Sequence, residues 1–269
     1  MVSADISKNI AKIDIGVFEG CSKLININIP QTMTKIPDNM FSGCESLKTI
    51  ELHEGVTEIG HCAFEGCKSL ESIVIPDSVT NIRYGAFERC INLSAISIPA
   101  NVGSIGELGD SISFWGNTGR GEDKNVFAYC DKLESITVSP ENTTYNDGNG
   151  SNAIIETETN SLITGCSKTV IPIFVTVLKK ESFIGCTGLE SITIPDNIMD
   201  IESYVFDKCS NLKTIFIGKG SYAENWAKDA RNFELSKDAV FKYFDGSEVV
   251  FGNGNEQSDG SGSSSDSQG

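Results

Sequence analysis

Histidine and cysteine are the residues of this chain with the most versatile chemistry, and their arrangement bears on catalysis. The sequence contains 2 histidines and 9 cysteines. His61 and Cys62 are adjacent, and these two residue types can form a thiolate–imidazole nucleophile. Side chains of sequence neighbours usually point apart, however, and no third group is placed to orient the imidazole. His53, the other histidine, stands at the end of a predicted strand. Since neither histidine belongs to a convergent group of catalytic side chains, we predict no catalytic residue and no enzyme.

Metal ligands need a different spacing from the one found here. Most cysteines recur at long intervals instead of in the close Cys-x-x-Cys pairs that bind zinc. Asp147, Asn149, Ser151 and Glu158 match positions 1, 3, 5 and 12 of a calcium-binding loop, but Asn152 stands where that loop requires glycine. No helix is predicted on either side of this segment. We therefore expect neither a metal nor a cofactor.

The cysteines belong to an internal repeat with a period of 23 residues, which is clearest in the spacing from Phe18 to Phe41, Phe64 and Phe87. Seven copies share the pattern Phe-x-x-Cys-x-x-Leu. Their cysteines are Cys21, Cys44, Cys67, Cys90, Cys130, Cys186 and Cys209. A fixed period of this length is the signature of a repeat architecture, in which each copy forms one coil.

Within one copy, the pattern of apolar residues predicts the elements that place these side chains. Ser72–Ile75 alternates polar and apolar residues, as a half-buried strand does, and Pro76 ends the pairing. Val79 and Ile82 predict a second short extended segment. Ala63–Cys67 suits one helical turn that points its phenylalanine inward. One coil therefore has two flat sides and a corner.

No single copy can bury its apolar residues, so the copies must stack and pair their strands into a sheet. The predicted fold is a right-handed, β-strand-rich solenoid of 23-residue repeats with short helical turns, having seven recognisable repeats and two insertions. Cysteine is a small apolar filler in such a core, and parallel side chains in adjacent coils do not point at each other. We expect the repeated cysteines to be buried free thiols.

The motifs Ala-Phe-x-x-Cys-x-x-Leu and Ile-x-Ile-Pro-x-x-Val-x-x-Ile resemble those of the BspA-like, or Treponema pallidum-type, leucine-rich repeats over about residues 10–218. The resemblance implies a surface-exposed or secreted protein that takes part in adhesion to host or matrix proteins or to other microbes. Residues 1–12 contain no apolar run of the kind found in a signal peptide, which leaves a cytoplasmic location open.

The chain is predicted to have three parts. These are a solenoid over residues 1–218 with insertions at about 106–125 and 139–176, a cap of helix and hairpin over 219–251, and a flexible Gly/Ser/Asp-rich tail over 252–269. Ser221 and Glu224 form a capping box that begins a short helix ending at Ala230. Asp245–Gly246 is a hairpin signal within the cap. The array begins part-way through a copy, so we expect either that the chain is a fragment or that its N-terminal end is an interface.

The two insertions allow different interpretations. The first contains the aromatic pair Phe114–Trp115, which is either a contact site or a cover that folds back over the solenoid wall. The second contains Asn152–Glu156 and Leu162–Cys166 around a polar segment, which predicts a β-hairpin with a structural role.

Charge narrows the classes of partner. The formal net charge is −16, which repels nucleic-acid phosphates and anionic lipid headgroups, and no stretch is long enough to be a transmembrane helix. We therefore expect a protein partner, with a glycan as an alternative, and neither nucleic acid nor membrane insertion.

The outward positions of the predicted main strands vary from copy to copy, whereas the inward ones hardly change. With the aromatic pair of the first insertion, the candidate partner-binding residues are Thr49, Glu51, Ser72, Val74, Ser97, Ser135, Thr137, Ser191, Thr193, Thr214, Phe216, Phe114 and Trp115. Hydroxyl groups dominate this face and can hydrogen-bond a partner with little steric hindrance. We predict a non-catalytic interaction module; the alternatives are a glycan-binding module and a passive spacer.

Overall fold

Five of the alternating segments of the repeat, with one further strand at each end of the array, form the main ladder. The computed structural model describes residues 2–8, 10, 13–106, 125–230, 235 and 239–250. The main-ladder strands are β1 (Val2–Asp5), β2 (Leu24–Asn28), β6 (Ala95–Ile98), β8 (Ser135–Val138), β13 (Ser191–Thr193), β15 (Thr214–Ile217) and β16 (Val240–Tyr243). All of the pairs β1–β2, β6–β8, β13–β15 and β15–β16 are parallel.

The main ladder is interrupted, so the expectation of one continuous sheet is wrong. Residues 49–51 and 72–75 keep the alternating burial of a strand but are not assigned as strands. There the coils are joined before the alternating segment, where the Glu71 N–H donates to the Lys48 carbonyl at 3.2 Å. Packing of Ile50, Ile73 and Ile75 into the core keeps these coils in register without a full ladder.

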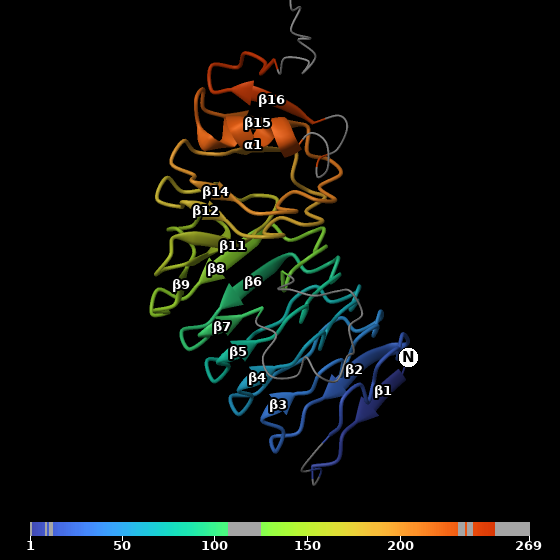
Figure 1. The fold of residues 1–269 in the computed structure, drawn as a ribbon. Coiled ribbons are helices and arrows are strands. Elements are labelled where there is room, and N and C mark those ends of the chain that lie inside the picture. The colour runs from blue at the N-terminus through green and yellow to red at the C-terminus, as the bar shows by residue number, and fades with distance from the viewer. Residues whose placement is uncertain are drawn as a thin grey trace, which may run out of the picture.

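The Val-x-x-Ile segments form a second, minor ladder. In the N-terminal part it comprises β3 (Lys35–Ile36), β4 (Glu58–Ile59), β5 (Asn81–Ile82) and β7 (Ser104–Ile105), all parallel. It resumes in β12 (Val177–Leu178) and β14 (Asp200–Ile201), which also pair in parallel. The paired isoleucines Ile36 and Ile59 lie one 23-residue period apart and are fully buried. Figure 1 shows the coils stacked from β1 and β2 to α1 and β16.

The Phe-x-x-Cys segment is a series of tight turns, not the helical turn predicted from the sequence. The Cys67 N–H donates to the Phe64 carbonyl at 3.1 Å, whereas the Phe64 N–H donates to Ala86 in the next coil at 2.8 Å. Cys62 and Gly66 flank the phenylalanine with φ angles of 52° and 68°. Left-handed residues cannot continue an α-helix, and the bonds between coils replace the bonds of a helix.

The phenylalanines of the first five copies form a stack inside these turns. The ring centroids of Phe64 lie 5.4 Å from those of both Phe41 and Phe87, with near-parallel planes. The Phe87 ring continues the stack to Phe127 at 5.5 Å. Each ring inside this stack is therefore covered on both faces by its neighbours. Phe183 and Phe206 form a second stacked pair in the C-terminal half, with ring centroids 5.2 Å apart.

The repeated cysteines are free thiols, and seven of the nine cysteines are buried. The Cys67 Sγ donates to the Phe41 carbonyl at 3.2 Å, a contact that recurs between other coils. Burial raises the pKa of Cys44 to about 12, so this thiol stays protonated and can donate. Cys21 differs because it is exposed in the first complete copy, so the expected burial is wrong for this residue.

The second insertion is the predicted β-hairpin, since β10 (Ala153–Glu156) pairs antiparallel with β11 (Ser161–Gly165). On its other edge β10 pairs with β9 (Tyr145–Asn146), while β11 continues in parallel into β12. Ile154 packs into the N-terminal core and Ile155 into the C-terminal one. The hairpin therefore joins the two halves of the solenoid by burying side chains on both of its faces.

The helix predicted from the capping box is present as α1 (Tyr222–Ala230). The Ser221 hydroxyl oxygen accepts from the Glu224 N–H at 3.2 Å, and the Glu224 carboxylate accepts from the Gly220 N–H at 2.6 Å. Trp226 packs edge-on against Phe206 in the last Phe-x-x-Cys turn, with ring centroids 6.0 Å apart. The helix thus covers the end of the aromatic stack.

The predicted hairpin of the cap is present in part. Tyr243 donates its N–H to the Ser247 carbonyl at 2.8 Å, and Lys242 bridges Glu248 in antiparallel fashion, but residues 248–250 are not a strand. Instead β16 pairs with β15 and extends the main ladder, which the sequence did not reveal. The tail at 252–269 and the aromatic pair Phe114–Trp115 lie outside the described residues.

Candidate functional site

The residues considered for catalysis have structural contacts. His53 Nε2 lies 3.0 Å from the Pro30 carbonyl, and its Nδ1 accepts from the Gly55 N–H at 3.0 Å, so the imidazole holds the corner where other copies have proline. The His61 ring lies 6.3 Å from the Tyr84 ring in a tilted arrangement. Cys62 occupies a left-handed turn position. These contacts position the turns of adjacent coils.

The segment that resembles a calcium loop also has a structural role. Asp147 Oδ1 accepts from the Gly150 N–H at 3.0 Å, and the Ser151 hydroxyl donates to the Asp147 carbonyl at 2.7 Å. These bonds stabilise the turn before β10. Within the described ranges, no group of three or more His, Cys, Asp or Glu side chains is arranged to hold a metal ion.

The predicted partner-binding residues lie in rows along the outward face of the main ladder, here called the main-strand face. Its exposed members are Thr49, Glu51, Ser72, Val74, Ser97, Thr137, Ser191 and Thr193, and its half-buried members are Ser135, Thr214 and Phe216. Val74 is the most prominent apolar side chain of this face, with 78% of its surface exposed. Because Ser97 pairs with Thr137 and Thr193 with Phe216, the residues of adjacent coils stand side by side.

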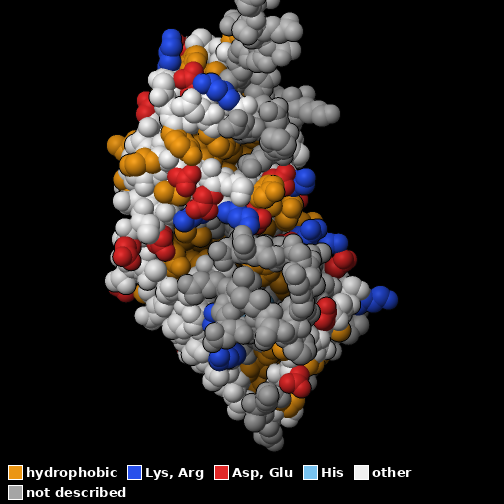
Figure 2. Space-filling model, in the orientation of Figure 1, with side chains coloured by type: hydrophobic (Ala, Val, Ile, Leu, Met, Phe, Trp, Pro, Cys, Tyr) orange, Lys and Arg blue, Asp and Glu red, His pale blue; other side chains and the backbone are white. Residues whose placement is uncertain are grey.

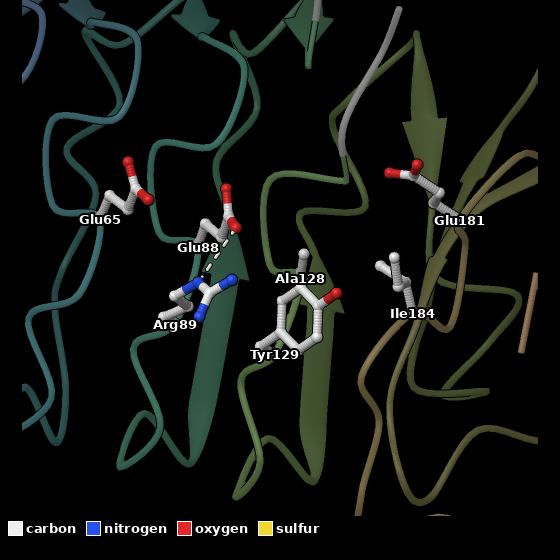
Figure 3. Close-up of a pocket in the computed structure, with 7 residues that line it drawn as sticks. All are labelled: Glu65, Glu88, Arg89, Ala128, Tyr129, Glu181 and Ile184. Carbon is white, nitrogen blue, oxygen red and sulfur yellow. Dashed lines mark hydrogen bonds and ion pairs between the residues drawn. The ribbon is translucent and has the colours of Figure 1, made fainter. Parts of the chain in front are cut away.

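A cleft of about 580 Å³ lies on a different side of the coil, across the Phe-x-x-Cys turns. We call it the turn-side cleft, and its lining residues are Glu65, Glu88, Arg89, Ala128, Tyr129, Glu181 and Ile184. Figure 3 shows that these residues come from neighbouring coils and that the Arg89 side chain extends toward Tyr129. The Arg89 guanidinium carbon lies 4.9 Å from the Tyr129 ring centroid, and its Nε lies 3.3 Å from Glu88 Oε1.

Three residues of the turn-side cleft, Arg89, Tyr129 and Glu181, have positive φ angles, and the first two stand at a position that is glycine in most copies. The residue before each repeated cysteine has a positive φ, and it is glycine in Gly20, Gly43, Gly66 and Gly185. Arg89, Tyr129 and Lys208 stand at the same position with φ angles of 61°, 59° and 60°. A non-glycine residue at this position costs about 1 kcal/mol or more in backbone strain. This departure from glycine was the sequence signal for the cleft.

The Tyr129 ring is enclosed on both faces. Arg89 covers one face, and a Cβ added to Gly185 would lie 2.3 Å from Tyr129 Cδ1, so the Gly185 backbone is pressed against the ring. Burial and the Asp207 carboxylate raise the pKa of Tyr129, while Arg89 opposes this effect. The phenol therefore remains protonated at neutral pH and can donate a hydrogen bond.

A patch of exposed hydrophobic side chains lies beside the minor ladder of the C-terminal half. Val170, Ile173 and Met199 expose 71%, 82% and 68% of their surface, and Phe174 exposes 42%. Figure 2 shows hydrophobic side chains at the surface beside β12 and β14. Ile173 and Phe174 follow Pro172, at positions where other copies have Asp77 and Ser78 or similar polar residues.

The stacked 23-residue coils, with one phenylalanine, one cysteine and two ladders per coil, define a leucine-rich-repeat solenoid. The chain belongs to the BspA type leucine rich repeat region family, whose model matches residues 1–109 and 153–227 in 6 copies. No curated protein matches the chain. No helix in the described part of the chain is long and apolar enough to cross a membrane.

Solved structures share this fold. A leucine rich cell surface protein from Faecalibacterium prausnitzii has 24% identity and a TM-score of 0.56, covering 82% of this chain and 68% of that one. The pneumococcal vaccine antigen PcpA has 21% identity and a TM-score of 0.56, with coverages of 81% and 62%. The leucine rich repeat protein of T. pallidum has 22% identity and a TM-score of 0.50, with coverages of 88% and 86%. At these identities the similarity establishes the fold.

Proposed function

We propose that the chain is a non-catalytic interaction module that binds a protein partner through the main-strand face. The observation that carries this proposal is that the buried and the exposed positions of the repeat behave differently. The buried positions repeat the same residue types in the seven copies, whereas the exposed positions of the main ladder differ between adjacent copies. A surface of this kind spreads contact over several coils, as recognition by repeat proteins requires.

A protein partner is favoured over a glycan by the side chains on this face. Sugar rings bind to exposed aromatic platforms, and Phe216, the aromatic candidate among the described residues of the face, is half-buried. Exposed hydroxyls next to Val74 and Glu51 suit a polypeptide surface with mixed polarity. The F. prausnitzii protein of similar fold is described as a cell surface protein, which supports a location at the cell surface. There we propose adhesion to a host or matrix protein.

The proposal is tested by two arginines placed on the main-strand face. A matrix protein is first captured by the immobilised wild-type chain. Its affinity is then measured for the wild-type chain and for the double variant Ser72→Arg with Ser97→Arg, which changes two exposed residues of adjacent coils. Steric clash and charge should weaken binding by at least about tenfold, while the melting temperature stays unchanged. The matched control is Thr57→Arg with Thr80→Arg, which adds the same charge beside the minor ladder, where both threonines are exposed.

Wild-type affinity in the control pair, together with loss in the main-strand pair, supports the proposal. Equal loss in both pairs would mean that added charge alone prevents binding. If the main-strand pair binds normally while deletion of residues 107–124 removes binding, the first insertion carries the function and the proposal is wrong. Loss of binding after glycosidase treatment of the partner would favour the glycan alternative.

A further inference from the structure

Three segments of the chain have the tripeptide Asn-x-Ser or Asn-x-Thr with a residue other than proline in the middle, and they begin at Asn92, Asn142 and Asn149. This tripeptide is the acceptor for N-linked oligosaccharides in secreted proteins. An attached oligosaccharide is bulky and hydrated, so the asparagine that carries it must lie at the surface of the finished fold. The structure therefore distinguishes between the three asparagines.

Two of the three asparagines hold adjacent coils together. Asn142 is buried, and its side-chain nitrogen donates to the carbonyls of Pro99 at 2.8 Å and Val102 at 2.9 Å. Asn92 is half-buried, and its side-chain nitrogen donates to the Lys68 carbonyl in the preceding coil at 2.7 Å. A sugar on Asn142 would break both of its bonds and would have no space, so the fold excludes it there and disfavours it on Asn92.

Asn149 differs from both because its side chain has no structural role. It is exposed in the turn before β10, and its φ of 62° lies in the left-handed region that asparagine adopts more readily than most residues. Among the described residues, none accepts a hydrogen bond from its side-chain nitrogen. The turn is held instead by Asp147, which accepts from the Gly150 N–H and from the Ser151 hydroxyl.

The turn itself is fixed to the solenoid. A Cβ added to Gly148 would lie 2.7 Å from Pro172 Cγ, so the backbone there is pressed against the segment that follows the hairpin. The Ser151 carbonyl accepts from the Val170 N–H of the same segment at 3.0 Å. A substituent on the exposed Asn149 side chain therefore leaves the contacts that hold this turn intact.

We propose that Asn149 is a glycosylation site, which carries an N-linked oligosaccharide received from a polyprenyl diphosphate during export. The side-chain nitrogen of Asn149 forms a bond to the anomeric carbon of the sugar. The bond between that carbon and the diphosphate oxygen breaks, the carrier leaves with the electron pair, and a base of the transferase takes the amide proton. The inference rests on the location outside the cell in the proposed function, and it does not depend on which face binds a partner.

The test is export of the full chain, behind an added signal peptide, from a eukaryotic cell that carries out N-glycosylation. Peptides of the secreted protein are analysed by mass spectrometry before and after N-glycosidase, which converts each glycosylated asparagine to aspartate. Occupancy at Asn149 should exceed occupancy at Asn142 by at least about tenfold, because a sugar on Asn142 must break two buried hydrogen bonds.

Two variants are the controls. Asn149→Asp keeps the size of the side chain and its tolerance of the left-handed backbone, so the chain should be secreted without a sugar at this position. Asp245→Asn completes the same Asn-Gly-Ser tripeptide with Gly246 and Ser247 in another turn, where all three residues are exposed, and it should add a second sugar.

An unmodified Asn149 in a chain that is glycosylated at position 245 would overturn the proposal. Glycosylation of Asn142 in the secreted protein at the same occupancy as Asn149 would also overturn it, because burial would then not select the site. Occupancy is read from peptide masses and not from binding, so a failure of the main-strand face to bind a partner would leave this result unchanged.

Discussion

Replacing Phe64 by alanine is expected to lower the free energy of unfolding by about 3–5 kcal/mol, the usual cost of truncating a fully buried aromatic side chain. Phe64 has no exposed surface, and its ring is stacked between those of Phe41 and Phe87 at 5.4 Å on each side. The substitution removes one ring and two stacking contacts. It also leaves a cavity that the hydrogen-bonded turns of the adjacent coils cannot fill by collapsing.

Chemical denaturation measures this loss. The control Val74→Ala lies about ten residues further along the same copy and truncates a side chain that is 78% exposed, so it should change stability by less than about 0.5 kcal/mol. A loss of under about 1 kcal/mol for Phe64→Ala would mean that the aromatic stack does not hold the coils together.

A second large effect is expected where the inserted hairpin meets the C-terminal half. A Cβ added to Gly165 would lie 2.1 Å from Cε1 of the Phe183 ring, and Phe183 exposes only 1% of its surface. Gly165→Ala should therefore lower the free energy of unfolding by about 2–3 kcal/mol, as expected for overpacking of a rigid core. Because alanine is otherwise acceptable in a strand, a decrease in the free energy of unfolding would come from the clash with the Phe183 ring.

The matched control is Gly103→Ala, since a Cβ on Gly103 would find its nearest neighbour, the Thr144 hydroxyl, 4.0 Å away. This change should be neutral or stabilise the protein by up to about 1 kcal/mol through the unfolded state. Equal effects of the two substitutions in thermal unfolding would contradict the close contact between β11 and Phe183.

The repeat made the fold predictable from sequence alone. A fixed 23-residue spacing requires equivalent residues of adjacent copies to stack, so the inward positions of Phe64, Cys67 and Leu70 followed from the pattern. The hairpin around residues 157–160 was also predictable, because polar residues there separate two apolar runs. These predictions depended on local spacing, which survives unchanged in the folded chain.

The shape of the turns could not be predicted in the same way. A phenylalanine and a cysteine three residues apart suit one turn of helix as well as a tight turn, and only the hydrogen bonds between coils decide between them. In the structure the Phe64 N–H bonds to Ala86 in the next coil, which a single copy of the repeat does not contain. The breaks in the main ladder have the same origin, since pairing depends on the distance between coils.

The two surfaces differ in how far the sequence revealed them. The main-strand face was predictable because strand alternation assigns Ser72 and Val74 to the outward side. The turn-side cleft was not predictable, because two of its lining residues, Glu88 and Glu181, are far apart in the sequence and the inserted hairpin lies between them in the chain. Its sequence signal was the replacement of glycine by Arg89 and Tyr129 at a position that favours glycine.

The claim that one exposed face carries the function is tested most directly by hydroxyl-radical footprinting of the chain with and without its captured partner. We expect protection at exposed side chains of the main-strand face in at least two adjacent coils, with Val74 and Thr137 among them. Reactivity of Ile173 and Met199 beside the minor ladder should stay unchanged. Protection confined to the minor ladder or to residues 107–124, with Val74 and Thr137 as reactive as in the free chain, would contradict the claim.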